Sequence, residues 1–248
     1  MSQVFKAYLD AGQTQKALAL VEKDLADARR RGDRSEEAGA LGNLGVIYKT
    51  MGDLAKAVEY ESTALSMYQT LGDRREVGTA LGNLGVTLRR LGRTNEAVDL
   101  ARQQIAVACE LQDAAGEASG LINLGNATMA NGDPEAALGH YASGLAVFQH
   151  SGDRTGEAKV LMNIGSVQFM LRDVPAAEAS HRQALAIFRE TGARRGEGIA
   201  LFNLALDRDR LGDRAAAVSL ATESLALLEE AQDPAAAQVR GALSGWRA

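Results

Sequence analysis

Residues 40–46 read ALGNLGV, and residues 80–86 read ALGNLGV again. Glycine and asparagine are poor helix formers, yet in both copies they stand among alanine and leucine residues, which favour helices. A string that recurs forty positions later indicates an internal repeat. An internal repeat of this length decides the whole fold.

Glycine marks a spacing of twenty residues along nearly the whole chain. It occupies positions 12, 32, 52, 72, 92, 132, 152, 192 and 212, and Gln112, Arg172 and Gln232 stand at three further points of the grid. Glycine readily adopts the left-handed conformation that ends a helix, and the aspartate that usually follows it is a good N-cap for the next helix. The spacing predicts helices of roughly 16 to 18 residues joined by short turns.

The helices alternate between two kinds, so the full unit is forty residues long. First helices carry asparagine at positions 43, 83, 123, 163 and 203, and second helices carry alanine at positions 17, 57, 97, 137, 177 and 217. No insertion or deletion breaks this register, which is typical of a solenoid whose units pack in the same way. We expect one solenoid over residues 1–248, with a partial first unit at 1–31, full units at 32–71, 72–111, 112–151, 152–191 and 192–231, and a helix at 232–248 whose Trp246 caps the core.

The motif residues resemble a known family. The order Leu41, Leu44-Gly45, Tyr48, Ala57, Ala64 is similar to the tetratricopeptide repeat (TPR), with leucine in place of tryptophan. The forty-residue unit and the segment from His181 to Ala205 resemble the long-helix variety of the Pins/LGN adaptors and of kinesin light chain, also found in bacterial regulators. The resemblance implies an all-α, right-handed superhelical solenoid of about 13 helices in antiparallel pairs. It also implies that the partner helix crosses closely at Gly45, Gly85, Gly125 and Gly165.

Composition and motifs argue against several classes of function. The formal net charge is −5, whereas duplex binding needs a basic face, so we expect no nucleic-acid partner. Cys109 is the only cysteine, and His140, His150 and His181 lack the spacing of metal ligands, so we expect no metal, no cofactor and no enzyme. No stretch of the sequence approaches about 18 apolar residues, so we expect no membrane partner and a soluble cytoplasmic protein.

The asparagine row needs a physical reason, because each asparagine costs several tenths of a kcal/mol in a helix interior. At about 100° per residue, Asn43 and its counterparts Asn83, Asn123, Asn163 and Asn203 lie away from the core stripe, on the side that lines the concave groove in TPR folds. Each carboxamide can accept from and donate to a peptide backbone, and the resemblance supports that role. The alternative is that each asparagine bonds to the neighbouring repeat and sets the superhelical pitch.

Other groove positions vary along the chain. The N-terminal half carries the basic residues Lys49, Arg89 and Arg90 among small ones, which we expect to attract acidic side chains. The C-terminal half carries the apolar residues Ile122, Met129, Met162, Phe169, Met170 and Phe202. We expect these to form an exposed patch that receives apolar anchors of the partner. The alternative is that they belong to the core, and that the arginines of the other half are simply solvated.

These patterns favour an adaptor that binds an extended or helical segment of another protein, with mixed acidic and apolar character, in its groove. Two alternatives remain open. One is a ligand-sensing or autoinhibitory module of a bacterial signalling or transcription regulator, and the other is a self-assembling scaffold in which the groove takes a neighbour's terminal helix.

Overall fold

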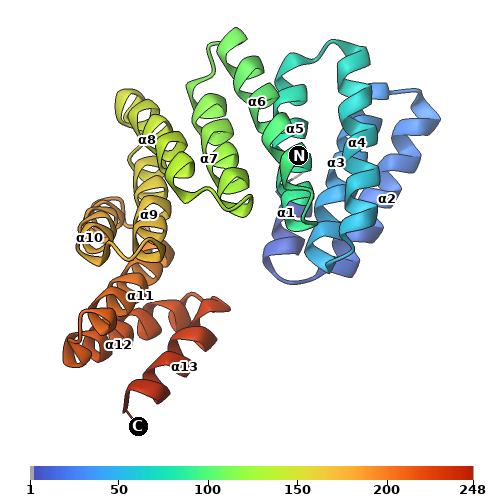
Figure 1. Ribbon diagram of the computed structural model, residues 1–248. Coiled ribbons are helices and arrows are strands. Elements are labelled where there is room, and N and C mark those ends of the chain that lie inside the picture. The colour runs from blue at the N-terminus through green and yellow to red at the C-terminus, as the bar shows by residue number, and fades with distance from the viewer. Residues whose placement is uncertain (1–2, 248) are drawn as a thin grey trace. The chain divides into compact units, whose positions relative to one another are not determined.

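The computed structural model describes residues 3–247, and every regular element in that range is an α-helix (Figure 1). The thirteen helices are α1 (Gln3–Asp10), α2 (Thr14–Arg31), α3 (Arg34–Met51), α4 (Leu54–Leu71), α5 (Arg74–Arg90), α6 (Thr94–Glu110), α7 (Ala114–Ala130), α8 (Pro134–Ser151), α9 (Arg154–Met170), α10 (Val174–Glu190), α11 (Arg194–Arg210), α12 (Arg214–Glu230) and α13 (Ala235–Arg247). Each predicted forty-residue segment contains one pair of helices. The all-α fold predicted from the sequence is confirmed.

The turns between helices have the predicted chemistry. All nine glycines of the grid have positive φ angles, for example 86° at Gly52. Aspartate side chains cap the helices that follow: Asp33 accepts from the backbone N–H of Glu36 at 3.0 Å, and Asp53 accepts from that of Lys56 at 3.1 Å. Each turn with such an aspartate therefore satisfies orphan groups of both helices that it joins, which fixes where they end and begin.

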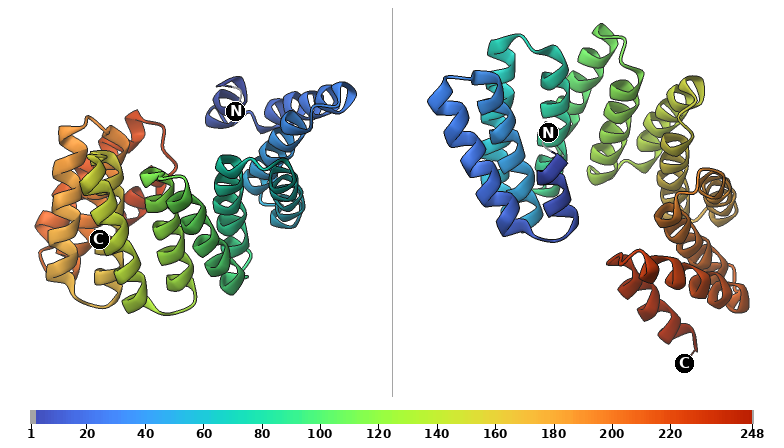
Figure 2. Two further views of the ribbon diagram at one scale, coloured as in Figure 1. Left: turned by 90° about the horizontal axis from the view of Figure 1, so that it is seen from above. Right: turned by 180° about the vertical axis from the view of Figure 1, so that it is seen from behind.

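Neighbouring helices pack on one another throughout two compact units of the chain. The units are Met1–Ala137 and Leu138–Ala248, and the division falls inside α8. Within the first unit, α3 packs on α4 and α5, and α5 packs on α6 and α7; within the second, α9 packs on α10, and α11 on α10 and α12. Figure 2 shows these successive pairs from two further directions. The continuity of one solenoid over residues 1–248 stays a prediction.

Gly45 and Gly165 lie where two helices cross closely, as the resemblance implies. A Cβ atom on Gly45 would overlap with the side chain of Glu61 on α4, and one on Gly165 would lie 2.5 Å from His181 Cδ2 on α10. Gly85 has more room, since its Cβ would lie 3.7 Å from that of Leu100. Close helix crossing therefore explains Gly45 and Gly165 but does not require Gly85.

The C-terminal helix completes the core of the second unit. Val239 and Leu243 of α13 are buried in a cluster with Leu228, and Trp246 packs against that cluster. The capping role that the sequence predicts for Trp246 stays a prediction. Among the described residues, none of the helices combines the length and the apolar composition that crossing a lipid bilayer requires.

The turns that lack glycine yield a prediction about stability. Gln112, Arg172 and Gln232 have φ angles of 53°, 67° and 51°, a left-handed conformation that costs a non-glycine residue about 1–2 kcal/mol. Replacing all three by glycine should therefore raise the free energy of unfolding by about 1–3 kcal/mol, after allowing for the greater entropy of glycine in the unfolded chain. Urea unfolding followed by circular dichroism measures the change. Gly92→Gln is the reverse control and should lower stability; equal stability of all variants would be inconsistent with strain at these turns.

Candidate peptide-binding site

Three asparagines of the row lie on the first helices of the N-terminal unit, where they line two cavities. Asn43 on α3 and Asn83 on α5 line the first cavity, of about 250 Å³. Asn83 and Asn123, which lies on α7, line the second cavity, of about 470 Å³. The cavities adjoin, because Glu76, Thr79 and Asn83 belong to both.

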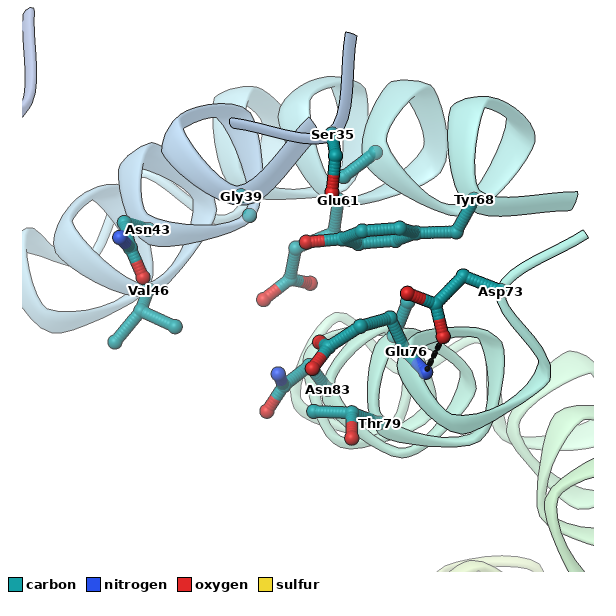
Figure 3. A pocket seen from close by; sticks show the side chains of 13 residues that line it. Ser35, Gly39, Asn43, Val46, Glu61, Tyr68, Asp73, Glu76, Thr79 and Asn83 are labelled. Atoms are coloured by element: carbon teal, nitrogen blue, oxygen red, sulfur yellow. Dashed lines mark hydrogen bonds between the residues drawn. The ribbon is translucent and has the colours of Figure 1, made fainter. Parts of the chain in front are cut away.

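The first cavity lies between α3, α4 and α5 (Figure 3). Gly39 and Gly42 form its α3 wall, and because they lack side chains they leave the space open. Glu61 and Tyr68 reach it from α4, and Glu76 reaches it from α5. Gly39 and Gly42 thus leave a cavity open, whereas Gly45 allows two helices to cross closely.

The second cavity repeats the first one unit further along the chain. Gly82 and Thr79 stand where Gly42 and Gly39 stand in the first cavity, and Gln104 stands in the place of Ala64. The Gln104 carboxamide reaches toward Gly82, where an added Cβ would lie 2.9 Å from its Nε2 atom. The strict register of the repeat therefore places two related cavities side by side on one face.

The carboxamides of the row differ in their hydrogen bonding. Asn123 donates to Gln104 Oε1 at 2.9 Å, and Asn203 lies 3.4 Å from His181 Nε2. These two contact the second helix of the preceding unit, as the structural alternative predicts. Asn43, Asn83 and Asn163 are half-buried, and their side chains form no hydrogen bond within the described part of the chain. Their donors and acceptors are available to a ligand.

A buried polar pair accompanies Asn203. His181 Nδ1 lies 2.7 Å from Asp207 Oδ2, and both side chains are buried between α10 and α11. The pair links two consecutive helices of the second unit, so His181 has a packing role. Asp207 was not singled out by the sequence analysis, because its position is occupied by different residue types in the other units.

The basic residues of the N-terminal half are not placed as the sequence analysis expects. Lys49 Nζ pairs with Glu61 Oε1 at 2.9 Å, and Arg90 donates to the Lys49 carbonyl at 3.2 Å. Neither they nor Arg89 line the two cavities. The attraction of acidic side chains by these three residues therefore has no support from the cavity geometry.

The charged residues that line the first cavity are instead all acidic, and Tyr68 adds a phenol group. Burial, reinforced by the negative charges of Glu76 and Asp73, raises the pKa of Tyr68 to about 12, so its hydroxyl stays protonated at neutral pH. Sequence reasoning missed Glu61 and Tyr68 because it considered only first helices as groove walls. The sequence did carry one signal for this wall of the cavity, because Glu61 is a carboxylate on the inward face of a second helix.

The predicted apolar patch needs a correction at two positions. Met162 and Phe202 are only 9% and 7% exposed, and each belongs to a buried hydrophobic cluster of the C-terminal unit. They stand at the repeat position that Gly42 occupies in residues 32–71. A large side chain at this position packs against the neighbouring helices. The core is wider at this position than the helical wheel indicates, so these two residues are not part of an exposed surface.

The other apolar residues remain accessible to different degrees. Met170 is 58% exposed, and Phe169 is half-buried with the Arg210 guanidinium 6.0 Å from its ring centre. Ile122 and Met129 on α7 are also half-buried. Within residues 3–247, no group of three or more histidine, cysteine, aspartate or glutamate side chains is placed to hold a metal ion.

Known proteins match the chain in family and in fold. The family model described as Tetratricopeptide repeat matches residues 36–110, 116–190 and 157–230. The crystal structure of BtubC (BKLC) from P. vanneervenii has a TM-score of 0.74 at 21% identity, covering 88% of this chain and 92% of that one. A Rap protein complexed with competence and sporulation factor has a TM-score of 0.72 at 14% identity, covering 98% of this chain and 72% of that one.

A third solved structure is a signal transduction ATPase with numerous domains from Pyrococcus horikoshii, described as having a tetratricopeptide repeat sensor. It has a TM-score of 0.74 at 16% identity, and the match covers 98% of this chain and 37% of that one. At these identities the likeness shows the fold alone. Among curated proteins, no sequence matches the chain.

The burial of Phe202 and the exposure of Met170 predict that their substitution by alanine affects stability differently. Phe202→Ala should lower the free energy of unfolding by about 3–5 kcal/mol, since it leaves a cavity in the core. Met170→Ala should change it by no more than about 0.5 kcal/mol, because the side chain is exposed. Denaturant unfolding of both variants measures the difference. Similar small losses for both would mean that Phe202 lies at a surface after all.

Proposed function

The chain belongs to the tetratricopeptide repeat family, and from the site described above we propose that it binds a peptide segment of a partner protein through the asparagine row. The proposal rests on one observation: Asn43, Asn83 and Asn123 line two adjoining cavities on one face of the N-terminal unit. TPR folds serve generally as interaction scaffolds, and no enzymatic family is indicated.

Hydrogen bonding at this face suits a peptide backbone. A carboxamide offers one acceptor oxygen and two N–H donors, so it can pair with both the C=O and the N–H of an extended segment. Asn43 and Asn83 are the strongest candidates, because their side chains have no partner among the described residues. Each hydrogen bond contributes only about 0.5–1.5 kcal/mol. The cavities must therefore supply further affinity by taking side chains of the segment.

The partner's acidic and apolar character is less supported than the site itself. The basic residues lie outside the cavities, and Met162 and Phe202 are buried. Phe169 and Met170 remain candidates for a separate apolar contact in the C-terminal unit. Ile122 and Met129 remain candidates in the N-terminal unit.

A sensing role is the second candidate. The signal transduction ATPase is described as having a tetratricopeptide repeat sensor, and the Rap protein is described in complex with a factor. Peptide binding at the same face would be the input of such a sensor. A cytoplasmic location and self-assembly stay predictions.

The test compares the two unpaired asparagines with two exposed carboxamides elsewhere. Asn43→Ala/Asn83→Ala should weaken partner binding roughly tenfold or more, because it removes hydrogen bonds worth about 0.5–1.5 kcal/mol each. A pull-down from a cell extract, followed by titration of the captured protein against each variant, measures the effect. Circular dichroism should show equal or higher helicity, since alanine is the better helix former.

Gln69→Ala/Gln103→Ala is the matched control, because both glutamines are exposed on second helices and line neither cavity. This control should keep every partner. If the folded asparagine variant also keeps every partner at unchanged affinity, the peptide site lies elsewhere on the molecule.

A further inference from the structure

The first cavity is negatively charged, which the asparagine row does not explain. Its lining includes the carboxylates of Glu61, Asp73 and Glu76, and none of its lining residues is lysine or arginine. Lys49 approaches from outside the lining and pairs with Glu61. Three carboxylates against one ammonium group leave a formal charge of −2.

Glu61 carries an unsatisfied oxygen at the cavity. The residue is 2% exposed, and its Oε1 atom accepts from Lys49 Nζ at 2.9 Å. Its Oε2 atom is buried and has no hydrogen-bond partner. A buried carboxylate oxygen without a donor is costly, so a donor supplied by a ligand would be stabilised here.

Two further acceptors face the same space. Figure 3 shows the Glu76 carboxylate and the Tyr68 hydroxyl extending toward it, beside Glu61. The Glu76 side chain forms no hydrogen bond or ion pair with any described residue. Asp73 uses one oxygen to cap α5 by accepting the Glu76 N–H at 3.2 Å. Asn43 and Asn83 add their carboxamide groups to the same lining.

The second cavity provides an internal comparison. Forty residues beyond Glu61, Tyr68 and Glu76 stand Ala101, Ala108 and Gly116, and Arg75 takes the place of Ser35 in the lining. The second cavity has the same position in the repeat but less negative charge, because its lining has the carboxylates of Glu76 and Asp113 beside the guanidinium of Arg75, a formal charge of −1. Glu76 is shared by the two cavities, whereas Glu61 and Tyr68 distinguish the first cavity from the second.

We propose that the first cavity binds an arginine side chain of the partner segment, with Glu61 and Glu76 as its main acceptors. The proposal rests on the proposed peptide-binding function and names one side chain that the segment carries. A guanidinium group has five N–H donors in a planar fork and cannot be deprotonated, so it matches several carboxylate and amide oxygens around one space. Charge-assisted hydrogen bonds of this kind are about twice as strong as neutral ones.

The experiment titrates the full chain with blocked pentapeptides that differ at one position. The probes are acetyl-Ala-Ala-Arg-Ala-Ala-amide and its analogues with citrulline or glutamate in place of arginine. Citrulline has nearly the shape of arginine without the charge. Nitrogen-15 NMR should show saturable shifts of the Gly39, Gly42 and Asn43 amides with the arginine peptide. Its affinity should exceed that of the citrulline and glutamate peptides by about tenfold or more.

Variants assign the effect to the cavity. Glu61→Gln and Glu76→Gln should each weaken the arginine peptide by about tenfold, while Glu59→Gln should leave its affinity unchanged. Glu59 lies on α4 too but is exposed and outside the cavity. Amide spectra confirm that each variant is folded. Equal affinity of the citrulline peptide, shifts confined to Gly82 and Ser119 of the second cavity, or no saturable shift at millimolar concentration would each overturn the proposal.

The two proposals can fail separately. If Asn43→Ala/Asn83→Ala loses its partner while Glu61→Gln/Glu76→Gln keeps it, the peptide site stands and the arginine specificity is wrong. If the arginine peptide binds at the first cavity while the asparagine variant keeps every partner, the cavity is a cation site and the proposed function is wrong.

Discussion

The fold depends on a helix stop that recurs every twenty residues. A residue in the left-handed conformation ends one helix, and in most turns the next residue, an aspartate, caps the following helix. Because the turns do not vary in length, side chains forty positions apart lie at equivalent places in successive helix pairs. This fixed register brings Asn43, Asn83 and Asn123 to two adjoining cavities. A different residue at one repeat position therefore changes the shape of the protein only around that residue.

One repeat position illustrates this consequence. It holds Gly42, Gly82, Ile122, Met162 and Phe202 in successive units. Where it holds glycine, the space beside the first helix is a cavity lined by asparagine. Where it holds Met162 or Phe202, the side chain is buried in the core. Small residues at this position thus leave a cavity open in the N-terminal unit, and large ones fill the core of the C-terminal unit.

The sequence predicts the helices well because their signals are local. Glycine, aspartate and the asparagine row specify ends, caps and phase without reference to the rest of the chain. The site is harder to predict, because its walls come from three helices. Glu61 and Tyr68 belong to a second helix, so a wheel drawn for α3 alone omits them. The burial of Phe202 likewise depends on neighbouring helices that the wheel does not contain. The wheel also omits the pairing of Lys49 with Glu61, because these residues lie on two different helices.

Gly42→Met copies Met162 into the repeat at residues 32–71, and it shows whether glycine at position 42 keeps the first cavity open for a partner. An added Cβ at Gly42 would lie 3.9 Å from that of Ala64 and has room. We expect stability to be equal or higher by up to about 1 kcal/mol, since glycine is a poor helix former, and partner binding to be lost. Gly139→Met, at an exposed helix position with nothing within 4 Å, should keep binding. Undiminished binding by a folded Gly42→Met variant would show that the cavity is not the site.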